Sequence, residues 1–127
     1  MTSTIPSPLV LVAEDDVVIA RLFARVLEAD GFRVHLVVDG REALQWLAAE
    51  RPDVILLDIE MPHVDGRDVL SRLRDDERLF DVPVFVISGR DDDYTRENVI
   101  RLGARDLIGK PVDPEAILRR VRRVLST

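Results

Sequence analysis

Short apolar runs alternate along the chain with segments whose apolar residues recur every three or four positions. Such runs cover residues 9–13, 54–57, 84–87 and 107–108, and the longer ones are rich in valine, isoleucine and leucine, which is typical of strands buried on both faces of a parallel sheet. Residues 32–38 include Arg33 and His35 but have enough β-branched residues for a further strand. The pattern therefore predicts five strands separated by helical segments.

Each run is followed by a segment with one apolar helical face. The first such face recurs at i, i+3, i+4, i+7 and i+8, ends before Asp30-Gly31, and consists of Ile19, Leu22, Phe23, Val26 and Leu27. The second face consists of Ala43, Leu44, Leu47 and Ala48, and the third of Val69, Leu70 and Leu73. The fourth helix is expected at about residues 91–102, and the face of the fifth consists of Ile117, Leu118, Val121, Val124 and Leu125. Gly103 is placed to end the fourth helix in a left-handed conformation. Five strands alternating with five helices predict an α/β fold of (βα)₅ type, a doubly wound parallel sheet covered on both faces.

Polar residues gather directly after the predicted strands. In an open parallel sheet, ligands bind outside the carboxyl ends of the strands, near the point where the strand order reverses. The polar residues at these ends are Glu14, Asp15 and Asp16 after the first strand, Asp58 and Glu60 after the third, Ser88 after the fourth and Lys110 after the fifth. We expect these side chains to converge on one edge of the sheet.

Several carboxylates that lie together need a cation. Two unit charges 4 Å apart repel by about 4 kcal/mol at an effective dielectric near 20, and a divalent ion relieves that cost. Ligation by oxygen alone suits Mg²⁺, or Mn²⁺, and such ions take a phosphate oxygen as a further ligand. The residues thus favour phosphoryl transfer, with Asp58 as nucleophile, a metal held by Glu14 and Asp15, and Ser88 with Lys110 as donors.

Four segments in this order carry a family resemblance: LVLVAEDD, DVILLDIEMPHVDG, VFVISG and GARDLIGKP. Over about residues 8–126 the chain resembles the receiver domain of bacterial two-component response regulators. The resemblance implies a flavodoxin-like sheet of order 2-1-3-4-5. It also implies that Asp58 is the phospho-acceptor and that Glu14 and Asp15 are metal ligands.

The resemblance implies further roles at the site. The backbone carbonyl of Glu60 would be another metal ligand, Ser88 would bind a phosphoryl oxygen, and Lys110 would pair with Asp58 or its phosphate. The Lys110-Pro111 peptide bond would be cis. Asp58 would receive its phosphoryl group from a phosphohistidine of a sensor histidine kinase or a phosphotransfer protein and lose it slowly, which makes the chain a signalling domain and not an enzyme. Downstream, an effector protein or domain would respond, and the fourth helix, fifth strand and fifth helix could form a homodimer.

Two positions depart from the family's pattern. Leu107 stands where the family usually has the Tyr or Phe whose ring moves on activation, so this route of signal propagation is expected to differ. Gly89 stands where alanine is commoner, and the missing Cβ should widen access to the phosphoryl group. A further hypothesis is that Glu60 and Arg90 pair across the mouth of the site and restrict the attacking water, so that Arg90→Ala would speed loss of the phosphoryl group.

Other interpretations of the same residues remain open. The acids after the first strand could cap the following helix, and Ser88 could cap the fourth helix in competition with Asp91. A phosphatase or phosphotransferase of the haloacid dehalogenase type also uses an Asp nucleophile, a hydroxyl residue and a Lys around Mg²⁺. That type of enzyme requires a second Asp at the position where this chain has Glu60. A receiver-like module that docks or dimerises without switching is the third possibility, supported by Leu107.

Composition narrows the range of partners. A formal charge of −6 disfavours direct binding of nucleic acid or an anionic membrane, and we interpret Arg119, Arg120, Arg122 and Arg123 as a solvated helix face.

No apolar stretch approaches the roughly 20 residues of a membrane span, and residues 1–8 lack a signal-peptide layout, so we expect a cytoplasmic protein. We expect residues 1–7 to be a flexible end, residues 8–126 to be one domain, and no output domain in this chain. Lys110 is the only lysine among 18 basic residues, which favours a specific role for a compact point charge.

Overall fold

A computed structural model describes residues 7–126 of the chain. The predicted flexible end at residues 1–7 therefore lies outside the described residues, except for Ser7, whose carbonyl oxygen accepts a hydrogen bond from Arg33 Nε at 2.8 Å. In the part of the chain that is described, no helix is long and apolar enough to cross a membrane.

Five parallel strands form a single sheet of order β2-β1-β3-β4-β5, which confirms the predicted fold class. Their bounds are β1 Leu9–Ala13, β2 Arg33–Val37, β3 Val54–Asp58, β4 Val84–Ser88 and β5 Asp106–Gly109. The central strands β3 and β4 are buried along their whole length, as expected for apolar runs covered on both faces.

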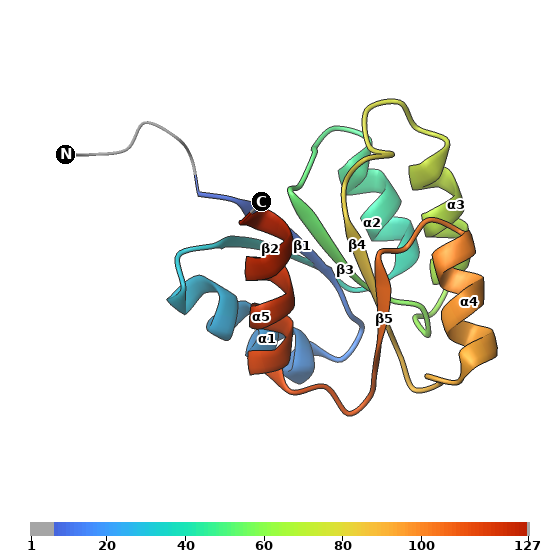
Figure 1. Ribbon diagram of the computed structural model, residues 1–127. Coiled ribbons are helices and arrows are strands. Elements are labelled where there is room, and N and C mark those ends of the chain that lie inside the picture. Colours follow the sequence, from blue (N-terminus) through green and yellow to red (C-terminus); the bar gives the residue numbers. More distant parts are fainter. Residues whose placement is uncertain (1–6, 127) are drawn as a thin grey trace.

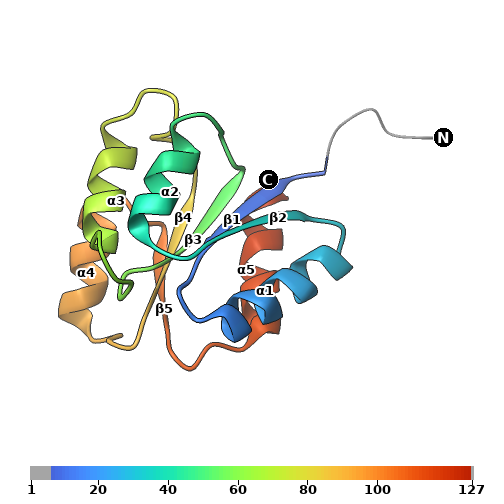
Figure 2. The ribbon, with the colours of Figure 1, turned by 180° about the vertical axis from the view of Figure 1, so that it is seen from behind.

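Five helices cover the two faces of the sheet. Their bounds are α1 Val17–Ala29, α2 Gly40–Leu47, α3 Gly66–Arg74, α4 Asp93–Arg101 and α5 Pro114–Leu125. Helices α1 and α5 lie on one face, and α2, α3 and α4 lie on the other, as the two opposite views show (Figures 1 and 2). The buried side chains accordingly form two hydrophobic clusters, one on each side of the sheet.

The strand order reverses beside β1, and this reversal positions the site. From β1 the chain crosses to β2 on one side and later to β3 on the other, with Ala13 of β1 paired to Leu57 of β3. The crossover helices therefore leave the carboxyl ends of β1 and β3 open between them, where ligands bind in doubly wound sheets.

An aspartate is the N-cap residue of each of the five helices. Each accepts a hydrogen bond from a backbone N–H of the first turn, and the set is Asp16, Asp39, Asp65, Asp92 and Asp113. Such a cap typically contributes about 1 kcal/mol. Asp16 is thus a helix cap, which leaves Glu14 and Asp15 for the site.

Several predicted boundaries were wrong by one or two residues. The fourth helix begins at Asp93 and not at residue 91, because Asp92 supplies the cap by accepting from Thr95 N. Asp91 instead lies against Gly109, where an added Cβ would come within 2.5 Å of Asp91 Oδ2. Ala48 is the exposed C-cap residue of α2 and not part of its inner face. The predicted left-handed residue Gly103 is confirmed, with φ of 114°.

Candidate functional site

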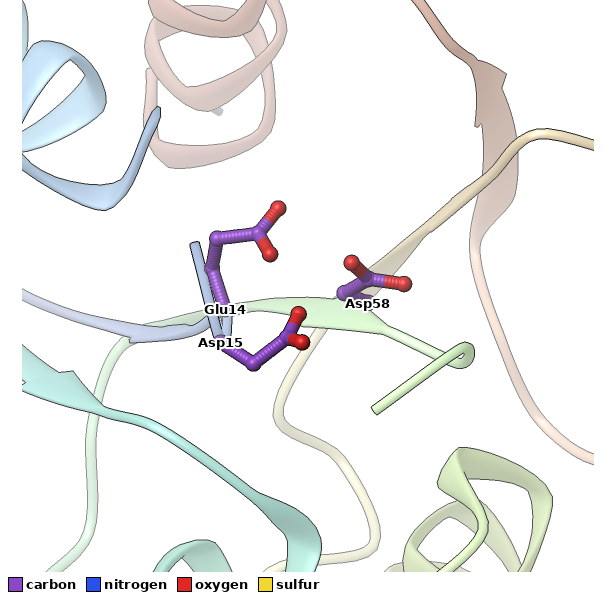
Figure 3. Close-up of side chains that lie close together, drawn as sticks. All are labelled: Glu14, Asp15 and Asp58. Carbon is purple, nitrogen blue, oxygen red and sulfur yellow. The ribbon is translucent and has the colours of Figure 1, made fainter. Parts of the chain in front are cut away.

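Three carboxylates converge at the carboxyl ends of β1 and β3. Glu14 and Asp15 follow β1, Asp58 is the last residue of β3, and one oxygen from each lies within 4.8 Å of the others. Figure 3 shows the three side chains pointing toward a common space. The predicted acidic cluster is therefore present, and it contains residues that are 44 positions apart in the sequence, such as Glu14 and Asp58.

Glu14 has one buried carboxylate oxygen without a hydrogen-bond partner. Its side chain lies beneath the surface, with only 2% of the residue exposed. Oε2 accepts a hydrogen bond from Asp16 N at 3.0 Å, but Oε1 is buried without a hydrogen-bond partner. Burial raises the pKa of Glu14 to about 8, the Asp16 N–H opposes the shift, and the charge of Asp58 adds to it.

This unsatisfied oxygen fits a bound cation. Among residues 7–126, Glu14 Oε1 is the only buried side-chain nitrogen or oxygen atom that lacks a partner. Buried polar atoms nearly always have one. Because the cluster offers only carboxylate oxygens, a hard ion such as Mg²⁺ suits its donor set.

Asp58 is fully buried, and both of its carboxylate oxygens accept hydrogen bonds. Oδ1 accepts a hydrogen bond from Glu60 N at 2.8 Å, and Oδ2 accepts one from Lys110 Nζ at 2.8 Å. The ion pair joins β3 to the connection after β5, across the intervening strand β4. A buried carboxylate needs such compensation, so the predicted pairing of Asp58 with Lys110 is present in the fold.

Lys110 is positioned by the end of the sheet. Ser88 of β4 pairs with Gly109 of β5, and Lys110 N donates to the carbonyl oxygen of Ser88 at 2.9 Å. The next peptide bond, Lys110-Pro111, is cis as predicted. Burial lowers the pKa of Lys110, but the hydrogen bond and charge of Asp58 outweigh it, so that the pKa is raised above its usual value.

Ser88 closes the same edge at the end of β4. The residue is buried, and its Oγ accepts a hydrogen bond from Arg90 N at 3.0 Å. The alternative role of Ser88 as the cap of α4 is not observed, because Asp92 occupies that position.

The predicted contact between Glu60 and Arg90 is not formed. Arg90 lies outside the site with its side chain 73% exposed, and its Nε is 3.8 Å from Asp92 Oδ2. Glu60 turns inward: its Oε1 accepts from Gly89 N at 2.8 Å and lies 3.4 Å from Lys110 Nζ. The Gly89 N–H bond holds the pKa of Glu60 below its usual range, burial opposes this shift, and Lys110 reinforces it.

The Glu60 carboxylate lies beside Gly89. A Cβ built there would lie 3.5 Å from Glu60 Oε1, which is ordinary contact, so the space beside Gly89 is bounded by the Glu60 carboxylate. The contact between Glu60 and Gly89 could not be predicted from the sequence. Glu60 lies two residues after Asp58, but that spacing does not determine which way its side chain turns.

Leu107 is buried in the core on the α4 side of the sheet. The neighbouring Asp106 joins β5 to both adjacent helices: its Oδ1 is 2.5 Å from Arg96 Nη1 of α4, and its Oδ2 is 2.8 Å from Arg120 Nη1 of α5. Arg122 pairs with Asp30 at the end of α1. Two of the four arginines of α5 are therefore engaged by acids of the same chain.

The comparisons with known proteins agree with this geometry. A family model described as response regulator receiver domain matches residues 10–122. Response regulator MprA of Mycolicibacterium vanbaalenii is 38% identical over 116 residues, which cover 91% of this chain and 49% of that protein. The chain thus spans about half the length of the curated relatives it matches.

Solved structures of receiver domains superpose closely. The receiver domain of Francisella response regulator 1452 has a TM-score of 0.87 at 31% identity, covering 93% of this chain and 96% of that one. The receiver domain of the sensor histidine kinase PA1611 of Pseudomonas aeruginosa, described with a magnesium ion coordinated in its active site cleft, has a TM-score of 0.85 at 28% identity, covering 95% and 99%. The match over nearly the whole chain, together with the strand order and the acidic cluster, shows that the chain belongs to the family of response regulator receiver domains.

Proposed function

We propose that Asp58 is the phospho-acceptor of this two-component receiver domain and that its donor is a phosphohistidine of a sensor histidine kinase or a histidine phosphotransfer protein. One observation carries the assignment: Asp58 is a fully buried carboxylate at the end of β3, with Lys110 Nζ 2.8 Å from Oδ2 and two further acids within 4.8 Å. A plain turn-forming aspartate requires neither a paired ammonium nor acidic neighbours.

The reaction follows from these groups. A carboxylate oxygen of Asp58 attacks phosphorus while the bond from phosphorus to the donor imidazole nitrogen breaks, and the electron pair of that bond stays on the nitrogen. Lys110 and the Ser88 hydroxyl stabilise the charge on the phosphoryl oxygens. Water later cleaves the acyl phosphate to phosphate and the free carboxylate. Because this last step is slow, the domain acts as a timed signal and not as a turnover enzyme.

Glu14, Asp15 and Asp58, with the backbone carbonyl of Glu60, would hold Mg²⁺ or Mn²⁺. The buried, unpartnered Oε1 of Glu14 supports this assignment. When bound, the cation neutralises charge on the cluster and on a phosphoryl oxygen.

An apolar pocket beside the site is suited to the phosphodonor. It has a volume of about 470 Å³ and lies between α1 and the connection from β5 to α5, next to Glu14 and Lys110. Its apolar lining includes Ile19, Leu22 and Pro111. A donor protein that covers this surface would bring its histidine to the acidic cluster. The proposed compartment for this reaction is the cytoplasm.

The output surface is proposed to be α4, β5 and α5, through an effector or a homodimer. Tyr94 and Ile100 of α4 are exposed large side chains on this part of the molecule. Leu107 has no ring that could swing inward, so we propose that the domain can be phosphorylated but transmits the change by a route other than an aromatic side chain at this position. Curated relatives about twice as long include a transcriptional regulatory protein, CseB of Streptomyces coelicolor, so a joined effector domain is one form of this output.

The assignment is tested by incubating the protein with Mg²⁺ and either acetyl phosphate or beryllofluoride. We expect a stable adduct in the wild type and none in Asp58→Asn. Absence of an adduct in both proteins would favour a docking module, whereas sustained hydrolysis of many phosphomonoesters would favour a phosphatase.

A further inference from the structure

The Glu60 carboxylate occupies the mouth of the site without belonging to the acidic cluster. Its Oε1 receives two donors from different parts of the chain, Gly89 N at 2.8 Å after β4 and Lys110 Nζ at 3.4 Å after β5. Glu60 itself follows β3, so one anionic oxygen joins the ends of three strands.

These two donors are also the ones that a phosphoryl group would need. Lys110 Nζ lies 2.8 Å from Asp58 Oδ2, so its ammonium is already beside the carboxylate that would carry phosphorus. The Gly89 N–H and the ammonium converge on a single point, which Glu60 Oε1 now fills. Charged oxygens bind most strongly where a cation and a backbone N–H meet in this way.

We propose that Glu60 is an internal anion that holds the phosphoryl-oxygen position in the unphosphorylated domain and leaves it when Asp58 is phosphorylated. The proposal rests on the proposed function of Asp58. A phosphoryl oxygen and the Glu60 carboxylate cannot share the same two donors, because two anions at one point repel and would compete for each hydrogen bond. Phosphorylation therefore turns the carboxylate outward and frees the segment between β3 and α3.

The pair is suited to displacement because it contributes little to folding. The side chains of Glu60 and Lys110 are 41% and 33% exposed, so solvent is available to the carboxylate when it leaves. Asp58, which is fully buried, keeps its own hydrogen bond to Lys110. Removing the Glu60 charge is thus expected to change the affinity for an added anion and to leave the fold intact.

Beryllofluoride, which mimics a phosphoryl group on an aspartate, provides the test. In the presence of Mg²⁺ we expect Glu60→Ala to bind it roughly three- to tenfold more tightly than the wild type, with Glu60→Gln in between, because a competing charge-assisted contact is removed. Glu97→Gln removes one exposed acid from α4 and serves as the matched control, with an affinity equal to that of the wild type. The melting temperatures of the Glu60 variants should stay close to that of the wild type.

The amide resonance of Gly89 provides a second readout. In the free protein, Glu60→Ala should shift the Gly89 N–H strongly upfield, because its carboxylate acceptor is gone, whereas the beryllofluoride forms of the two proteins should have similar Gly89 shifts. The displacement is refuted if all variants bind beryllofluoride equally and the Gly89 shifts still differ in the adducts, and in that case the assignment of Asp58 stands. Failure of every variant to form an adduct would instead overturn the assignment of Asp58 and this inference with it.

Discussion

Glu14 should make the affinity of the acidic cluster for Mg²⁺ depend steeply on pH. Burial raises its pKa to about 8, reinforced by Asp58 and opposed by the N–H of Asp16, so the carboxyl is largely protonated at neutral pH in the absence of a cation. A carboxyl must lose its proton to coordinate a metal, so Mg²⁺ and the proton compete for the same group.

The size of the effect follows from this pKa. With a pKa of about 8, roughly 1% of Glu14 is ionised at pH 6, roughly 9% at pH 7 and half at pH 8. The apparent affinity for Mg²⁺ should therefore rise about 50-fold between pH 6 and pH 8. About 0.9 proton should be released for each ion bound at pH 7.

Calorimetric titration with MgCl₂ at pH 6, 7 and 8, in buffers of different ionisation enthalpy, measures both quantities. Glu14→Gln should bind more weakly and with little dependence on pH. Asp16→Asn is the matched control, because it neutralises a neighbouring acid but keeps the backbone N–H that Glu14 accepts from. A change of less than about threefold in the wild type, or equal pH dependence in Glu14→Gln, would refute the reasoning.

The same group sets the pH dependence of stability without metal. The folded state keeps the Glu14 proton up to about pH 8, whereas the unfolded chain loses it near pH 4.5. The contribution of this protonated carboxyl to the free energy of unfolding is therefore complete below pH 4.5 and is lost as the pH rises toward 8. Glu14→Gln has no such proton to lose. Its free energy of unfolding relative to the wild type should therefore increase from pH 5 to pH 8, as measured by denaturant unfolding in the presence of a chelator.

Two further substitutions test the positioning of the site. Lys110→Arg should weaken beryllofluoride binding at least about tenfold while changing Mg²⁺ affinity little, because a planar guanidinium cannot reproduce a point charge between Asp58 and Glu60. Equal beryllofluoride binding by the wild type and Lys110→Arg would show that only the charge matters. Gly66→Ala should destabilise the fold by roughly 1–3 kcal/mol, because its Cβ would come within 2.5 Å of the Cα of Ile59 in the segment after Asp58. Gly89→Ala is the control for that measurement, since its Cβ would make only ordinary contact, and a similar loss of melting temperature in both variants would contradict the steric explanation.

The sequence predicted those features that local patterns determine. Buried parallel strands must be apolar along their length, so the five strands could be located, and the parallel topology then brought Glu14, Asp58 and Lys110 to one edge. The pairing of Asp58 with Lys110 was implied by the family resemblance, and the need of a buried carboxylate for a cation agrees with it.

Features that depend on side-chain direction in the connecting segments could not be predicted. The run Asp91-Asp92-Asp93 offers three similar caps for α4, and the contact of Asp91 with Gly109 helps to distinguish them only once β5 is in place. Glu60 could turn toward Arg90 or toward Lys110, and the Gly89 N–H that draws it inward comes from a different strand end. Such choices are made by contacts between elements and not by spacing along the chain.

The most direct test of the central claim is to locate the phosphoryl group on the chain. After incubation with acetyl phosphate and Mg²⁺, reduction with borohydride converts an aspartyl phosphate to homoserine, and peptide mass spectrometry then identifies the modified position. We predict homoserine at position 58 in the wild type and no modified residue in Asp58→Asn. Modification at another carboxylate in the wild type, or an equal yield of modified protein from Asp58→Asn, would contradict the account.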